Sequence, residues 1–289
     1  MIPGPFTYHR PSSVRDAVAL LAALGDDARP LAGGHSLIPM MKLRMAAPEH
    51  LVDLAGISEL KDIAEDGGTI VIGAGVTLAA LIRSQMLAAR LPVMRETALV
   101  IADPQVRYKG TIGGNVANGD PGNDMPALMQ ALGAHYVLSG TAGERRVAAR
   151  DFYRGTYDTA LAAGEIVAAI RIPVPPAGSA AAYEKLKRKI GDYATAAAAV
   201  ALTMVGDSVT NCAIALTNVA NRPLFAEAAS AAAVGTTLDP ATVRTVAEAA
   251  VAITSPAADR RGSAEYRRAM AGIMVTRALL KAASRAKGL

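Results

Sequence analysis

The most distinctive stretch of this chain is GTIGGNVANGDPGNDMPA, at residues 110–127. Five of its 18 residues are glycine, and it contains two aspartates but no lysine or arginine. Glycine-rich turns often direct backbone N–H groups toward a bound anion. This stretch has no basic side chain and ends in acid, so a simple phosphate loop does not account for it.

A second stretch of the same character, PLAGGHSLIPMMKL, occupies residues 30–43. It ends a predicted strand with two glycines and continues through His35 and Ser36. Two Gly-Gly turns about 80 residues apart predict a cradle in two parts. A pyrophosphate suits such a cradle because both of its halves are charged. The alternative for the first turn is a tight turn in which Ser36 caps a helix.

The acid at the end of the first stretch, Asp124, needs a different kind of partner. A carboxylate beside a pyrophosphate would repel it, so we expect Asp124 to face uncharged donor groups. Polyol hydroxyls fit, and Asn115 and Asn118 can both donate and accept. A ligand with a diphosphate and a hydroxylated chain describes FAD. Alternatively, Asp124 caps a helix whose first turn holds Met125 and Pro126, and both roles can hold together.

Three further features have a functional and a structural interpretation. In some FAD enzymes a histidine in a similar Gly-Gly-His turn carries the flavin covalently, but we favour a His35 that meets the ligand through its backbone.

The GAG at 73–75 has Leu78 where a dinucleotide fingerprint needs glycine, so we favour a plain strand-to-helix turn. EKLKRKIGDYATAAAA (184–199) is either a solvated strand face or a segment that brings a lysine and Tyr193 to the cofactor.

Composition excludes several classes of protein. Aromatic residues make up 4% of the chain and tryptophan is absent, which argues against a stacking platform for single-stranded nucleic acid. The net charge of +5 is spread along the sequence. A single cysteine, Cys212, excludes disulfides, iron–sulfur clusters and thiolate zinc sites within the chain. The four histidines show no ligand spacing, so we predict no metal site.

Length and pattern predict a multidomain α+β protein. The 289 residues suit two or three domains, and 52% are hydrophobic. Strands and helices do not alternate as regular βαβ units, and a proline-rich linker is predicted at 173–180. The N-terminus lacks the basic start and apolar core of a signal peptide, so we expect a cytoplasmic protein. The predicted helices are at 12–25, 78–102 with an interruption at Pro92, 224–234, 240–253 and 264–286.

At these residues the chain resembles a known family. AGGHSLIPMMKLRMA, QVRYKGTIGGNVANGDPGNDMPALM and YEKLKRKIGDYATAAAAVALTM are similar to the FAD-binding medium subunits of molybdenum hydroxylases. NGDPGNDMPALMQ resembles the carbon monoxide dehydrogenase branch rather than the xanthine branch. The resemblance covers nearly the whole chain. It implies a two-lobed FAD-binding domain of the PCMH/vanillyl-alcohol-oxidase type at 1–57 and 58–176, and a C-terminal flavoprotein domain with a small antiparallel sheet and helices at 177–289.

By matching positions, the resemblance also implies a set of FAD-binding residues. The first pyrophosphate loop would comprise Leu31, Ala32, Gly33, Gly34, His35, Ser36, Leu37 and Ile38, and the second would comprise Thr111, Gly113, Gly114 and Asn115. Asn118 and Asp124 would lie near the ribityl chain, and Ile101 and Val167 would pack against the cofactor. Lys185 would lie near FAD, and Tyr193 would lie in the segment over the isoalloxazine. The family binds FAD non-covalently, which supports the backbone role for His35.

The function implied by this resemblance is electron transfer. The partners expected are a large subunit with molybdenum cytosine dinucleotide and a small subunit with two [2Fe–2S] clusters, arranged as a dimer of heterotrimers. Electrons would pass from the clusters to FAD and on to an external acceptor, with no catalytic acid or base in this chain. Peripheral membrane association of the complex stays open. The alternatives are the medium subunit of a sister aldehyde or N-heterocycle dehydrogenase, a self-contained FAD oxidoreductase, and a flavin-free assembly protein.

Overall fold

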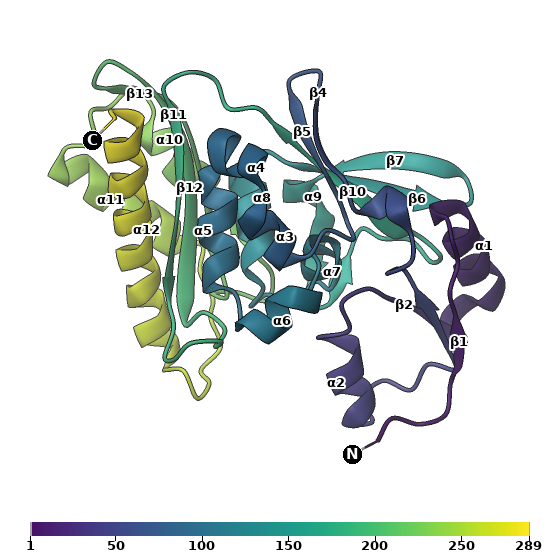
Figure 1. The fold of residues 1–289 in the computed structure, drawn as a ribbon. Helices are drawn as coiled ribbons and strands as arrows, with labels where there is room; N and C mark the ends of the chain where they lie inside the picture. Colours follow the sequence, from purple (N-terminus) through teal and green to yellow (C-terminus); the bar gives the residue numbers. More distant parts are fainter. Residues whose placement is uncertain (1, 289) are drawn as a thin grey trace.

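The computed structural model describes residues 2–288 and has the predicted α+β architecture (Figure 1). Its small N-terminal lobe is built on a parallel sheet in the order β1-β3-β2. These strands span Thr7–His9, His50–Asp53 and Ala28–Leu31. Helix α1 (Val14–Leu24) covers this sheet; Ser13 caps it by accepting from the Asp16 N–H, and Gly25 ends it with a φ of 57°.

A second lobe contains an antiparallel sheet of five strands in the order β4-β5-β10-β6-β7. The strands span Ile63–Asp66, Thr69–Gly73, Ile166–Pro173, His135–Gly140 and Gly143–Ala148. Between β5 and β6 the chain forms α3 to α8, which span Leu78–Arg83, Gln85–Arg90, Pro92–Val100, Pro104–Lys109, Ile112–Ala117 and Asp124–Ala131. The smaller elements near both lobes are α2 (Leu37–Lys42), the 3-10 turns Gly25–Asp27 and Ser58–Leu60, α9 (Ala149–Phe152), β8 (Tyr153–Gly155) and β9 (Asp158–Thr159).

The C-terminal part is a four-stranded antiparallel sheet backed by helices. Its strands β11 to β14 span Ser179–Leu186, Ala196–Val205, Ser208–Thr217 and Leu224–Phe225. Its helices α10 to α12 span Glu227–Ala233, Pro240–Ala252 and Ala264–Ala286. The three predicted C-terminal helices are confirmed, although the first begins at Glu227 because Leu224 and Phe225 pair with β13 as β14. Residues 2–288 contain no helix whose length and apolar character would let it span a bilayer.

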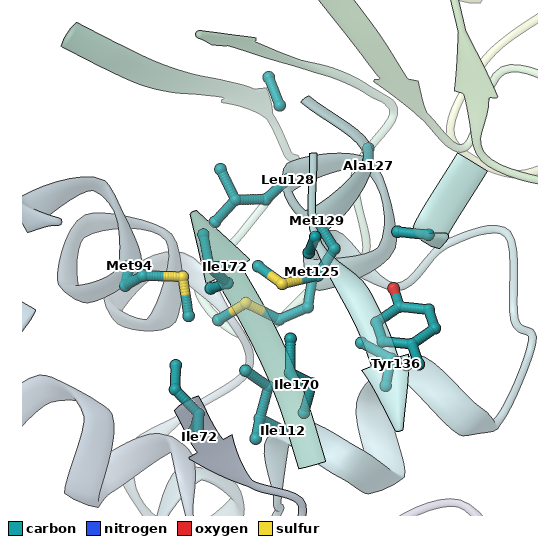
Figure 2. Close-up of a cluster of buried hydrophobic side chains, with 14 of the residues drawn as sticks. Ile72, Met94, Ile112, Met125, Ala127, Leu128, Met129, Tyr136, Ile170 and Ile172 are labelled. Carbon is teal, nitrogen blue, oxygen red and sulfur yellow. The ribbon is translucent and has the colours of Figure 1, made fainter. Parts of the chain in front are cut away.

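The main core joins the second lobe to the C-terminal sheet. Figure 2 shows its centre, where Met94 of α5 and Met125 of α8 lie beside isoleucines of β5 and β10. The same buried cluster includes Tyr183 of β11 and Ala197 of β12, because α5 and α8 lie between the two sheets. Side chains from the C-terminal part therefore reach the helices that follow the second glycine motif.

Two predictions about the middle of the chain were wrong in detail. The helical region predicted at 78–102 has the expected interruption at Pro92, which starts α5, but it also has a break at Ser84, which caps α4. The second Gly-Gly pair was expected in a turn, but it lies in helix α7 behind a Thr111 cap. Glycine is a poor helix former, so local propensity favoured a turn and close packing overrode it.

Candidate functional site

The predicted site residues line one cavity of about 600 Å³ between the two lobes and the C-terminal sheet. Its walls come from β2 and the following turn, from α6 and α7, and from β11 with the loop that follows it. Among the predicted residues only Ile38 lies outside the lining; its side chain instead packs beneath Gly34. A volume of this size falls within the range of small-molecule and cofactor pockets, roughly 300–1,000 Å³.

The first glycine turn offers unused donors to this cavity. No backbone N–H from Gly33 to Leu37 donates to an acceptor within residues 2–288. Gly34 has a φ of 75°, in the left-handed region that glycine adopts readily. Ser36 precedes α2 but makes no capping hydrogen bond, so the capping alternative for its side chain was wrong. Consecutive free N–H groups of this kind form an anion-binding concavity.

The second glycine motif behaves differently from the prediction. Its N–H groups are already used inside the protein: Ile112 donates to the Val76 carbonyl (2.9 Å) and Gly113 to the Ala74 carbonyl (2.9 Å). Gly114 donates to Oγ1 of Thr111 (3.0 Å), and Asn115 to the Thr111 carbonyl (3.0 Å). The two halves of the cradle are therefore unequal, and this half presents side chains and a surface rather than free N–H groups.

Glycine is required in both motifs because each approaches a neighbouring segment closely. A Cβ atom on Gly33 would lie 2.4 Å from the Lys109 carbonyl oxygen, and one on Gly113 would lie 2.4 Å from Cβ of Ala74. A side chain at Gly33 would therefore force the first turn away from the end of α6. The two motifs meet where Gly33 faces Gly110, and both of these glycines line the cavity.

Asp124 is held by residues of β11. Lys185 Nζ lies 2.8 Å from one of its carboxylate oxygens, and the Tyr183 hydroxyl donates to the other at 2.6 Å. The ion pair is buried, with side-chain exposures of 2% for Lys185 and 4% for Asp124. Burial raises the pKa of Asp124, and the charge and hydrogen bond of Lys185 oppose this. Lys185 thus supplies a positive charge beside residues 110–127, which contain no lysine or arginine.

The capping alternative for Asp124 was also wrong. Helix α8 begins at Asp124, and its first turn is satisfied from elsewhere, because Oδ1 of Asn115 accepts from the Met125 N–H at 3.2 Å. The side chain of Asn123 donates to the Asn115 carbonyl at 2.8 Å. Asn115 thus positions the start of α8, while the Asn118 amide makes no side-chain hydrogen bond within residues 2–288 and lines the cavity.

Cations fix the wall formed by the α5–α6 connection. Ala102 has a φ of 45°, which is uncommon for a residue with a Cβ, and it lines the cavity beside Ile101. Arg107 donates to the Ile101 carbonyl at 2.9 Å, and Lys187 donates to the Val100 carbonyl at 3.1 Å. Burial and the neighbouring Lys185 charge lower the pKa of Lys187. These contacts hold the wall in its strained conformation.

The stretch 184–199 combines both interpretations that its sequence allowed. Lys185 is inside the protein, whereas Arg188 and Lys189 are exposed in the loop after β11. Tyr193 lines the cavity and is 42% exposed, and the Arg261 guanidinium lies 5.6 Å from the centre of its ring. Burial raises the pKa of the Tyr193 hydroxyl, so this side chain stays neutral at physiological pH.

Sequence reasoning missed several residues of the site. Tyr183, whose hydroxyl holds Asp124, was not identified, and Asp192 and Glu165 also line the cavity. A signal for Tyr183 was present, because residues two apart in a strand share a face and Lys185 was already a candidate. No local pattern marks Asp192 and Glu165, which reach the cavity only through the tertiary fold.

Comparison with known proteins places this geometry in a family. The model for the FAD binding domain in molybdopterin dehydrogenase matches residues 4–175, and the model for the CO dehydrogenase flavoprotein C-terminal domain matches residues 181–282. The chain therefore belongs to the FAD-binding subunits of the molybdopterin dehydrogenases.

Within that family its similarity is to the medium chains of carbon monoxide dehydrogenases. It is 64% identical over 287 residues to the carbon monoxide dehydrogenase medium chain of Afipia carboxidovorans, covering 99% of this chain and 100% of the relative. It is 34% identical to the glyceraldehyde dehydrogenase medium chain of Sulfolobus acidocaldarius, over 98% and 100% of the two chains. A crystal structure of a Cu,Mo-CO dehydrogenase in its cyanide-inactivated form matches with a TM-score of 0.97 and 64% identity, over 99% of this chain and 100% of that one.

An ion pair at the cavity edge predicts a pH dependence of stability. The Arg145 guanidinium bonds both oxygens of Glu165, at 2.7 and 2.6 Å, and lowers the pKa of Glu165 below its ordinary value of 4.5. The pair therefore stabilises the fold fully above pH 4.5, and this contribution is lost as the pH falls through the lower, folded pKa. We expect Glu165→Gln to lower the melting temperature at neutral pH, with the difference shrinking below pH 4.5.

Melting followed by circular dichroism at a series of pH values measures this effect. Glu59→Gln is the matched control, because Glu59 is exposed and makes no ion pair within residues 2–288. A melting-temperature difference for Glu165→Gln that stayed constant from neutral to acidic pH would contradict the role of this carboxylate.

Proposed function

We propose that this chain is the FAD-carrying electron-transfer subunit of a molybdenum and iron–sulfur hydroxylase that oxidises carbon monoxide. The observation that carries the proposal is the run of unpaired N–H groups from Gly33 to Leu37 at the edge of a 600 Å³ cavity. Consecutive N–H groups that the protein leaves unpaired at a cavity wall are available to an anionic ligand. The diphosphate of FAD supplies acceptors for it.

The residues of the cavity fit the remaining parts of FAD. The Ser36 hydroxyl and the turn from Gly33 to Leu37 would hold the diphosphate, and the free amide of Asn118 would meet the ribityl hydroxyls. Each carboxylate oxygen of Asp124 accepts one hydrogen bond within the protein, which leaves lone pairs for the ribityl hydroxyls. In this proposal the His35 ring forms no covalent bond to the cofactor.

The apolar and aromatic walls would hold the flavin ring. Ile101 and Val167 line the cavity and are 7% and 5% exposed, and Tyr193 offers an aromatic face. Thr111, Gly113 and Gly114 form the surface against which the cofactor packs, since their polar groups bond within the protein. FAD supplies two-electron redox chemistry that can exchange electrons singly with iron–sulfur clusters. The protein's part is to bind and orient the ring, and we assign no acid or base to this chain.

The partners and the substrate in this proposal are inferred from the relatives to which the chain is similar. The proposed complex adds a large subunit with molybdenum cytosine dinucleotide and a small subunit with two [2Fe–2S] clusters, and an external acceptor receives the electrons. Carbon monoxide is favoured over an aldehyde because identity is 64% to a carbon monoxide dehydrogenase medium chain and 34% to a glyceraldehyde dehydrogenase medium chain. The proposal also includes domain boundaries at 57/58 and 176/177, a heterotrimeric assembly and a cytoplasmic location.

A double-mutant cycle separates the structural role of Asp124 from its role toward FAD. Asp124→Asn leaves the buried Lys185 without a counter-charge, so we expect the free energy of unfolding to fall by about 3–5 kcal/mol. Adding Lys185→Met removes that charge and should restore most of the stability. FAD retention should stay low in the double variant, because the carboxylate that meets the ribityl hydroxyls is still missing.

Urea unfolding of the chain and FAD content of the purified complex are the two measurements. A double variant that regained both stability and normal FAD content would show that Asp124 acts only through the fold.

The proposed function is tested by purifying the complex, separating its subunits under native conditions and locating the flavin. We expect FAD on this chain and carbon monoxide oxidation with an artificial electron acceptor. Gly33→Ala should abolish FAD retention, because its Cβ would lie 2.4 Å from the Lys109 carbonyl oxygen. Gly155→Ala is the control, since a Cβ there comes no closer than 3.8 Å to other atoms. The proposal would be overturned if the flavin were found on another subunit, or if Gly33→Ala and Gly155→Ala lost FAD to the same extent.

A further inference from the structure

Three cations converge on the backbone connection between α5 and α6, beside the cavity. Lys185 and Lys187 both donate to the Val100 carbonyl, at 3.3 and 3.1 Å. Arg107 donates to the Ile101 carbonyl at 2.9 Å and to the carbonyl of the following residue at 3.2 Å. We call Lys185, Lys187 and Arg107 the cation cluster. Three successive backbone carbonyls therefore accept from positive charge in a segment that forms part of the cavity wall.

The two lysines reach this connection because of the strand that carries them. Residues two apart in a strand point to the same face, and Tyr183, Lys185 and Lys187 follow that spacing at the end of β11. This face lies against α5, and Figure 1 shows α5 beside the C-terminal sheet. Glu184 points to the other face, where it pairs with Lys281 of α12 at 2.8 Å. The C-terminal sheet thus brings positive charge to the cavity wall.

Only one of the three cations is paired with a carboxylate. Lys185 pairs with Asp124 at 2.8 Å, whereas Lys187 and Arg107 make no ion pair within residues 2–288. Asp103, the carboxylate of the connection itself, is used to cap α6. Burial lowers the pKa of Lys187, and the neighbouring charges of Lys185 and Arg107 lower it further. Three cations beside two carboxylates leave an excess of positive charge, which would stabilise a negative charge placed at this wall.

A backbone peptide group of the connection adds to this excess. The N–H of Ala102 donates to no acceptor within residues 2–288, and Ala102 lines the cavity. That N–H shares its peptide group with the Ile101 carbonyl, which accepts from Arg107. The negative end of this peptide dipole is therefore paired with a cation, while its positive end is unpaired at the cavity wall. The cation cluster and the peptide dipole thus favour negative charge in the same part of the cavity.

We propose that the unpaired positive charge of Lys187 raises the reduction potential of the flavin held against this wall. This rests on the proposed function, in which Ile101 packs against the flavin ring. Reduction adds two electrons, which the partner's iron–sulfur clusters deliver, and one proton from water, and it leaves the flavin with a negative charge. A fixed cation stabilises that charged product more than the neutral oxidised flavin, so the equilibrium shifts toward reduction. The chain thereby favours electron flow from the clusters to its cofactor.

The test is a potentiometric titration of the flavin in the assembled complex, comparing the wild type with Lys187→Gln. Glutamine keeps a donor for the Val100 carbonyl but carries no charge. We expect the equilibrium constant for flavin reduction to fall at least ten-fold, which is about 30 mV for a two-electron couple. Lys187→Arg keeps the charge and should titrate as the wild type does.

Lys189→Gln is the matched control, because Lys189 is exposed in the loop after β11 and makes no ion pair within residues 2–288. Water and salt screen an exposed charge, so this variant should leave the potential unchanged. Arg107→Gln is a second variant, for the case in which Lys187→Gln does not assemble with FAD. It removes another charge of the cation cluster and should lower the potential in the same direction.

Three results would overturn the inference. The potential could stay at its wild-type value in Lys187→Gln and Arg107→Gln, or it could fall by the same amount in Lys189→Gln. An equal fall in Lys187→Arg would show that this side chain acts through the shape of the wall and not through its charge. Failure of the proposed function is distinguishable, because it appears as a wild-type complex whose flavin lies on another chain, whatever the variants do.

Discussion

The cavity depends on backbone contacts that only glycine permits. Gly33 lies against the Lys109 carbonyl at the end of α6, and Gly113 of α7 lies against Ala74, just after β5. The backbone N–H donors of the two glycine motifs are used differently. Ile112 and Gly113 donate to the segment after β5, and Gly114 and Asn115 donate to Thr111, whereas the N–H groups from Gly33 to Leu37 have no acceptor within residues 2–288. Both glycine pairs pack closely against neighbouring backbone, but only the first leaves its N–H groups without acceptors within residues 2–288.

The buried pair of Lys185 and Asp124 joins the C-terminal sheet to this arrangement. Burying two charges is costly, and the cost is offset here by a 2.8 Å ion pair and a hydrogen bond from Tyr183. The pair fixes the start of α8 against β11 and places a neutralised carboxylate on the cavity wall. A carboxylate can therefore stand near a diphosphate without the repulsion that an isolated Asp124 would cause.

Much of this could be predicted from the sequence, and the misses share one cause. The α+β fold, the C-terminal helices and the residues around the cavity follow from local patterns and from resemblance to a family. The helix around Gly113 and the partners of Asp124 were missed because they depend on packing between segments far apart in the sequence. Local propensity favours a turn at Gly113–Gly114, and contact with Ala74 overrides it. Capping by Asp124 was likewise displaced by Asn115, which no local pattern connects to α8.

In the proposed complex, FAD takes its backbone hydrogen bonds from the first glycine turn and not from the second. Hydrogen–deuterium exchange of the assembled complex, with its flavin and after flavin removal, tests this most directly. Removal should speed amide exchange strongly in peptides that cover Gly33 to Leu37 and change it little at Ile112 to Asn115, whose N–H groups already bond within the protein. Faster exchange confined to Ile112–Asn115, with Gly33–Leu37 unchanged, would show that FAD takes its hydrogen bonds from the second motif instead.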